Sequence, residues 1–169
     1  MKKFKIWKLV KKDTYKDVND CIKKLKKSGI ILSPWIENIF KNKKNNIIYN
    51  YKNYELYKVK VSDLGFSRAT KLKNIYFRIK KINYSLVPPD VALRTRKLYK
   101  NQKRGEWIRF ATPFNSMIDN DNIPHLPKLG SALGKLFIET YWSYPDAIFH
   151  PHNEFIVTKK NDISKFKNK

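Results

Sequence analysis

One stretch of the sequence combines the residue types that bind nucleic acid. Residues 94–109 contain four of the six arginines of the chain, together with lysines, a tyrosine and a tryptophan. A guanidinium can bind phosphate through two hydrogen bonds, and an aromatic ring can stack on an unpaired base. The alternative is that the two rings belong to the core and the cations only face solvent. The sequence predicts a surface for RNA or another single-stranded nucleic acid, formed by Arg94, Arg96, Lys97, Tyr99, Lys100, Lys103, Arg104, Trp107 and Arg109.

Three histidines are the weak candidates for catalysis. His125, His150 and His152 all lie in the last third of the chain. A pair of imidazoles can cleave RNA by acid–base chemistry, and three can bind zinc. The spacing of the three histidines is specific to neither chemistry, and no CxxC or HExxH motif accompanies them. We therefore expect histidines in exposed loops, with no catalytic residue, no metal and no cofactor.

Other sequence motifs give no support to the common enzyme classes. GxxxxGK[ST], GxGxxG and GxSxG are all absent, so nucleotide hydrolysis, dinucleotide redox chemistry and serine-hydrolase chemistry have no motif here. The glycines of residues 130–134 predict a hairpin turn rather than a phosphate-binding loop. Residues 119–122 lack the glycine and glutamate of a calcium loop and predict a plain turn. Cys21 lies beside an apolar helical stripe, which predicts a buried and unreactive thiol.

The net charge of +23 differs in origin and in amount along the chain. Lysine outnumbers arginine 31 to 6, and the commonest residues are those of A- and T-rich codons, so part of the charge reflects an AT-rich genome. Residues 1–60 have 17 lysines against five acids, residues 61–110 have 13 basic residues against three acids, and residues 111–160 have four lysines against five acids. A preference for A- and T-rich codons alone would spread lysine evenly over exposed positions, but the counts are uneven. The sequence therefore predicts a basic first two-thirds and a near-neutral last third.

Hydrophobic periodicity and capping residues predict the elements that position these groups. We expect strands over about residues 4–10, 54–61, 106–110, 135–142 and 154–159. We expect helices over about 15–28, from Ser33-Pro34 onward, from a cap at Thr70 to near Asn83, and from Pro89 toward Leu98. The order predicts an α+β fold, in which an N-terminal strand and a helical hairpin precede a mostly antiparallel sheet with one or two further helices.

Length and composition predict a single α+β domain over residues 1–160, with a small N-terminal lobe over 1–46 as an option and a basic flexible tail over 161–169. No run of 18 apolar residues occurs, so we expect no membrane partner. The single cysteine fits the cytoplasm or another reducing intracellular compartment.

A set of short motifs resembles a family of small bacterial proteins of unassigned function. In that pattern a Trp-containing basic strand and a helical pair precede the motifs, and an Asp-rich turn and a terminal strand follow them, which covers residues 1–160 here. The family pattern is far less lysine-rich, which implies that the charge does not define the family. The matching motifs are Leu64-Gly65-Phe66, Ala69-Thr70, Ile75-Tyr76, Arg78, Pro88-Pro89-Asp90-Val91, Leu93-Arg94, Tyr99-Lys100, Gln102 and Gly105-Glu106-Trp107.

Three functions are compatible with these features, in this order of preference. The first is a non-enzymatic module that binds RNA or single-stranded nucleic acid. The second is a protein-interaction module, such as an inhibitor or a ribosome-associated subunit, whose charge reflects an AT-rich genome. The third is a His-dependent phosphodiesterase or ribonuclease. Arginines on one face with an exposed Tyr99 or Trp107 would favour the first, and convergent histidines would favour the third.

Overall fold

The computed structural model describes residues 3–159, so the predicted tail over 161–169 lies outside the described residues. The helices within this range are α1 (Val18–Lys27), α2 (Pro34–Lys41), α3 (Leu72–Lys81) and α4 (Asp90–Leu98). The strands are β1 (Ile6–Val10), β2 (Ile31–Leu32), β3 (Tyr54–Lys60), β4 (Thr70–Lys71), β5 (Tyr84–Ser85), β6 (Trp107–Phe110), β7 (His125–Ala132), β8 (Lys135–Trp142), β9 (Ile148–Phe149) and β10 (Glu154–Lys159).

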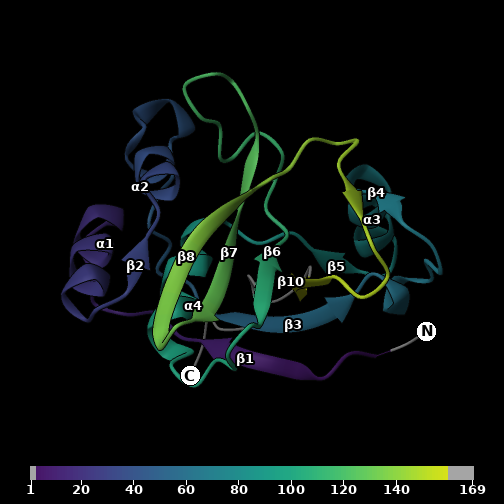
Figure 1. The fold of residues 1–169 in the computed structure, drawn as a ribbon, viewed down its shortest axis with the longest axis horizontal. Helices are drawn as coiled ribbons and strands as arrows, with labels where there is room; N and C mark the ends of the chain where they lie inside the picture. The colour runs from purple at the N-terminus through teal and green to yellow at the C-terminus, as the bar shows by residue number, and fades with distance from the viewer. Residues whose placement is uncertain (1–2, 160–169) are drawn as a thin grey trace.

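The main sheet has the strand order β1-β3-β10-β6-β7-β8-β2, with β5 paired to β10, and β4 and β9 form a separate two-stranded sheet. The β10–β6 and β2–β8 pairs are parallel, and the other pairs are antiparallel. Figure 1 shows α1 and α2 beyond β8 at one end of the sheet and α3 at the other. The predicted α+β class with a mostly antiparallel sheet is confirmed.

Capping side chains start both N-terminal helices by satisfying free backbone N–H groups; α2 begins where the sequence predicts it, whereas α1 begins at Val18, three residues later than predicted. The Asp17 carboxylate accepts a hydrogen bond from the Asp20 amide at 2.8 Å and starts α1. The Ser33 hydroxyl accepts one from the Ile36 amide at 3.3 Å, and Pro34 occupies the first turn of α2.

The sheet has a hydrophobic cluster on each face, and side chains that alternate along a strand join opposite clusters. On one face, which we call the helical face, the β6, β7 and β8 residues Ile108, Leu129 and Ile138 pack with apolar residues of α1, α2 and α4. On the opposite face, Phe155 and Val157 of β10 pack with the apolar side of α3. Cys21 is fully buried in the first cluster, as predicted.

The structure differs from the sequence prediction at three places. The sequence pattern does not predict β7, because Pro127 and Gly130 are unfavourable inside a strand. Thr70 does not cap α3: it pairs with Phe149 between β4 and β9, and Lys71 holds the cap position without a side-chain hydrogen bond. The expected helical hairpin is interrupted by β2, which pairs with β8. No helix within residues 3–159 is long and apolar enough to span a membrane.

Candidate nucleic-acid interface

Arg94 does not lie on a surface. Its side chain is 1% exposed, and its guanidinium donates hydrogen bonds to the main-chain carbonyls of Asn50 and Lys52 at 2.7 Å and of Lys11 at 2.8 Å. These bonds connect α4 to the segments before β3 and after β1. The expectation that Arg94 binds phosphate is therefore corrected: its donors are used inside the protein.

Arg96 and Tyr99 are also part of the interior. Arg96 is fully buried and donates to the Gln102 side chain at 2.5 Å and to the Tyr99 carbonyl. Burial lowers the pKa of Arg96 to about 10. The Tyr99 hydroxyl donates to Glu106 at 2.6 Å, and Lys58 forms an ion pair with the same carboxylate at 2.7 Å. Neither Arg96 nor Tyr99 can contact a strand bound on the surface, so these two assignments are corrected as well.

The remaining predicted residues separate into two groups on different sides of the molecule. The cations on and after α4 are exposed, and α4 packs on the helical face of the sheet. The two residues of β6 are half-buried, and the register places them on the opposite face, together with Phe155 of β10. The first group is Lys97, Lys100, Lys103 and Arg104, and the second is Trp107 and Arg109.

The second group belongs to a continuous surface that we call the platform. Its residues come from adjacent strands and are in register across the sheet: Trp107 lies opposite Gly130, which lies opposite Phe137, and Arg109 lies opposite Lys128, which lies opposite Glu139. Its side chains are half-buried, and Gly130, which has no side chain, is buried. The platform consists of Trp107 and Arg109 on β6, Lys128 and Gly130 on β7, and Phe137, Glu139 and Tyr141 on β8.

Gly130 determines how the Trp107 ring lies. A Cβ atom at position 130 would stand 2.1, 2.3 and 2.4 Å from three consecutive carbons of the indole. These nearly equal distances mean that the ring presents its face, rather than its edge, to the glycine. Only a residue without a side chain leaves room for this contact. The Phe137 ring follows at a centroid distance of 6.3 Å.

Two cations lie among the rings of the platform. The Lys128 amine is 4.6 Å from the Trp107 ring centroid and 5.5 Å from that of Tyr141, and the Arg109 guanidinium is 4.9 Å from Tyr141. Partial burial lowers the pKa of both groups, and the neighbouring Arg109 lowers the pKa of Lys128 further. Glu139 is the one carboxylate of the platform, and its negative charge raises the pKa of Lys128.

The Arg109 guanidinium keeps unused hydrogen-bonding capacity. Its buried Nε atom has no hydrogen-bond partner among the described residues. Its contacts are instead to aromatic rings, those of Tyr141 and of Phe149, the latter at 5.7 Å. Because Nε is buried, an oxygen-rich ligand would have to bind the terminal N–H groups of this guanidinium. The platform thus combines flat apolar rings with donors for an anion.

The histidines do not form one site. The expectation of exposed loops is wrong for His125, which lies in β7 and is 1% exposed; its Nε2 atom lies 2.9 Å from the Asp119 carboxylate. Although burial alone would raise it, the pKa of Asp119 is lowered by this hydrogen bond and by two backbone N–H groups. His150 and His152 are exposed and stack on each other at 5.8 Å. In the described part of the chain, no three His, Cys, Asp or Glu side chains lie close enough to share a metal ion.

Comparisons with known proteins add no relative: no protein-family model, no curated protein and no solved structure matches this chain. The resemblance to a bacterial family therefore stays a prediction, and the function has to be inferred from the geometry of the platform.

Sequence reasoning missed Lys128, Phe137 and Tyr141. The signal that could have found two of them is the alternation of the strand at 135–142, where Phe137, Glu139 and Tyr141 share one face. Lys128 required the register between β7 and β6, which the sequence pattern does not contain.

Proposed function

We propose that the chain is a non-enzymatic protein that binds RNA or single-stranded DNA on the platform. The observation that carries this proposal is the half-exposed Trp107 ring lying flat on Gly130, with Phe137 beside it and Lys128 and Arg109 in the next row. Unpaired bases stack on such rings, and the two cations are placed to bind the phosphates between the bases.

The electrostatics of the platform favour a polyanion. Lys128 and Arg109 are partly removed from water, which disfavours their charged forms, and one carboxylate, Glu139, favours the charged form of Lys128. A bound phosphate would restore the balance of charge and supply acceptors to the terminal N–H groups of Arg109. Stacking adds about 1–3 kcal/mol for each base.

A binding experiment with matched variants tests the proposal. We expect a fluorescently labelled ten-nucleotide single strand to bind more tightly than the same sequence in a duplex, because paired bases cannot stack on the rings. Trp107→Ala should weaken binding about tenfold or more, as expected for the loss of one stacked base. The control is Phe77→Ala, which removes a 65% exposed ring on α3, outside the platform. Equal affinity of Trp107→Ala and the wild type would refute the assignment.

Gly130→Ala tests the same site without removing a ring. The added methyl group would overlap the Trp107 indole and turn it away from the sheet. Gly130 does not have a positive φ, so alanine suits its backbone. We expect thermal unfolding close to that of the wild type, a red-shifted tryptophan emission and weaker binding of the single strand. A variant that binds as the wild type does would show that the ring position does not matter.

The ribonuclease alternative has less support, because His125 is buried against Asp119 while His150 and His152 stack elsewhere. Under this proposal, RNA should stay intact after long incubation with the purified protein, with and without divalent metal ions.

A further inference from the structure

Glu139 is the one acidic side chain of the platform, although a carboxylate repels the phosphates that this surface is proposed to bind. The register places it directly opposite Lys128, which itself lies opposite Arg109. Residues opposite each other on antiparallel strands share one face of the sheet, with their Cβ atoms about 5 Å apart. Glu139 therefore lies in one row with both cations, two residues after Phe137 on the same face of β8.

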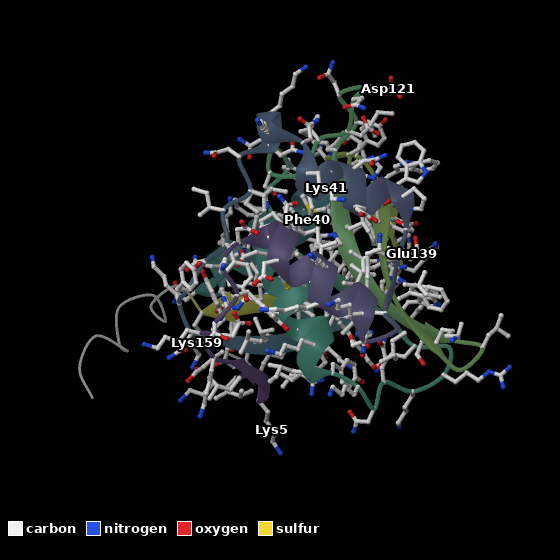
Figure 2. The ribbon with its side chains drawn as sticks, turned by 90° about the vertical axis from the view of Figure 1, so that its left-hand side faces the viewer. Lys5, Phe40, Lys41, Asp121, Glu139 and Lys159 are labelled. Carbon is white, nitrogen blue, oxygen red and sulfur yellow. The ribbon has the colours of Figure 1, made fainter. Side chains whose placement is uncertain are left out.

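The Glu139 carboxylate is not held by the protein. Within residues 3–159 it forms no hydrogen bond and no ion pair, although a lysine lies directly opposite. Two other acids, Glu37 and Glu106, form ion pairs with lysines at 2.6 and 2.7 Å. Neither Glu139 oxygen is enclosed, although the residue is half-buried, and Figure 2 shows Glu139 to the right of α2, which packs on the helical face. Both oxygens are thus open to the donors of a ligand.

The four bases differ in the hydrogen-bonding groups of their Watson–Crick edges. Guanine presents two neighbouring donors, N1–H and the 2-amino group, and next to them the acceptor O6. Adenine, cytosine and uracil each place an acceptor beside a donor, so one oxygen of a carboxylate would face a lone pair. On this edge a carboxylate can therefore accept two hydrogen bonds from guanine but not from the other bases, and an ammonium group beside it can donate to O6.

Glu139 and Lys128 together present the complement of the guanine edge. A base that stacks on Phe137 has its edge near Glu139, because residues two apart on a strand are separated by about 7 Å. The Lys128 amine is also near, 5.5 Å from the ring centroid of Tyr141, which is the next residue on this face of β8. An ammonium group has three donors, so Lys128 can bind O6 and a phosphate at the same time.

We propose that the platform selects guanine, which stacks on Phe137 while Glu139 accepts hydrogen bonds from N1–H and the 2-amino group and Lys128 donates to O6. This inference rests on the proposed function, because the guanine belongs to the single strand that the platform holds. Stacking on Trp107 and the phosphate contact of Arg109 are the same for every sequence, and Glu139 adds the preference. The carboxylate also repels nearby phosphates, so a strand without guanine binds less tightly than it would to an uncharged side chain.

Ten-nucleotide strands of uridine with one central G, A, C or U test this selection. We expect the wild type to bind the G strand at least about fivefold more tightly than the other three, which is the lower end of the effect of one bidentate base contact. Inosine lacks only the 2-amino group of guanosine, so an inosine strand should lose most of the preference. Equal binding of the G, A, C and U strands would overturn the selection of guanine, as would equal binding of the inosine and G strands. A loss of affinity for all strands in Trp107→Ala would still support the platform.

Glu139→Gln separates the selection from the general affinity. The substitution keeps the size of the side chain and removes its charge, so we expect it to abolish the preference for G and to bind the A, C and U strands more tightly than the wild type. The control is Glu154→Gln, which removes a half-buried carboxylate that lies on the helical face with Ile156 and pairs with Lys58 at 3.7 Å. This control should keep the preference for G.

Two results with Glu139→Gln would overturn the selection of guanine. If the variant binds all four strands more tightly by the same factor, the carboxylate only repels phosphate. If it weakens every RNA strand and no DNA strand, the carboxylate binds the ribose 2′-hydroxyl group instead of the base.

The indole N–H signal of Trp107 gives a readout that needs no strand. It can be assigned with Trp107→Ala and followed by NMR while each of the four nucleoside monophosphates is added to the full chain. We expect the guanosine nucleotide to shift it at the lowest concentration, and Glu139→Gln to remove this difference. Equal shifts with all four nucleotides would support the platform and overturn the selection of guanine. If no nucleotide moves the signal and Trp107→Ala binds the strands as the wild type does, the proposed function itself fails.

Discussion

Two of the four arginines in residues 94–109 cannot reach a ligand, because they lie in the buried part of α4. Arg94 makes three hydrogen bonds to main-chain carbonyls, and Arg96 is enclosed by Gln102 and Tyr99. An arginine in this position satisfies carbonyl groups that no strand or helix pairs with. The spacing of arginines in a sequence is the same whether they serve this structural purpose or bind phosphate, so only the tertiary structure separates the two.

Asp90 gives this interior a measurable pH dependence. The carboxyl group is fully buried, and burial raises its pKa to about 6, although the Asn50 amide at 2.8 Å and the nearby Arg94 lower it. The folded protein therefore keeps a proton that the unfolded chain has lost between about pH 4 and 6. The stabilising contribution is fully present below the ordinary pKa and is lost as the pH rises through about 6.

The comparison that isolates this effect is urea unfolding of the wild type and Asp90→Asn at pH 4.5 and pH 7. Asparagine stays neutral at both values, so we expect the wild type to lose stability relative to the variant as the pH rises, by about 3 kcal/mol at most. Other carboxyl groups with a lowered pKa, such as Asp119, are common to both proteins and cancel. A stability difference that is independent of pH would show that Asp90 is ionised in both states.

At the scale of elements, the turn between β7 and β8 is the least favourable part of the platform scaffold. Both turn residues have positive φ, 50° at Leu133 and 70° at Gly134, and Leu133 is 81% exposed. A two-residue hairpin turn with this backbone prefers asparagine followed by glycine, because asparagine tolerates the left-handed conformation and leucine does not.

We therefore expect Leu133→Asn to stabilise the protein by about 0.5–1 kcal/mol in urea unfolding. Leu133→Ala is the matched control, since it also removes the exposed side chain but does not favour the left-handed backbone. The free energy of unfolding of Leu133→Ala should be close to that of the wild type. If both variants stabilise the protein equally, the effect comes from the exposed leucine and not from the turn.

The same elements show how much the sequence could predict. The helices α1 and α2 and the strands β3, β8 and β10 follow from local capping and periodicity, and they are confirmed. The pattern failed where tertiary contacts decide. β7 contains Pro127 and Gly130, which are unfavourable in a strand, and the glycine is retained there beneath the Trp107 ring. The candidate site was found in part, because Trp107 and Arg109 lie on a predicted strand whose neighbours could not be inferred.

At the scale of the whole molecule, the basic and near-neutral parts of the chain meet in the platform. β6 belongs to the basic first two-thirds, and β7 and β8 belong to the near-neutral last third. The charge of +23 therefore acts at two ranges under the proposed function. Lysines far from the platform attract a polyanion through the overall field, and Lys128 and Arg109 contact it directly.

The salt concentration distinguishes the long-range attraction by distant lysines from direct contact by Lys128 and Arg109. Replacing Lys23 and Lys27 on α1 with glutamine removes two exposed charges, and the same change at Arg109 and Lys128 removes two charges from the platform. At about 10 mM salt, where the Debye length is about 30 Å, both double variants should bind the single strand more weakly than the wild type. At about 150 mM salt, where the Debye length is about 8 Å, the α1 variant should match the wild type while the platform variant still binds weakly.

The platform variant should also lower the slope of log affinity against log salt by about 1.4, given about 0.7 for each phosphate contact on a single strand. If the α1 variant is the weaker one at the higher salt concentration, the helices carry the contact and the platform does not.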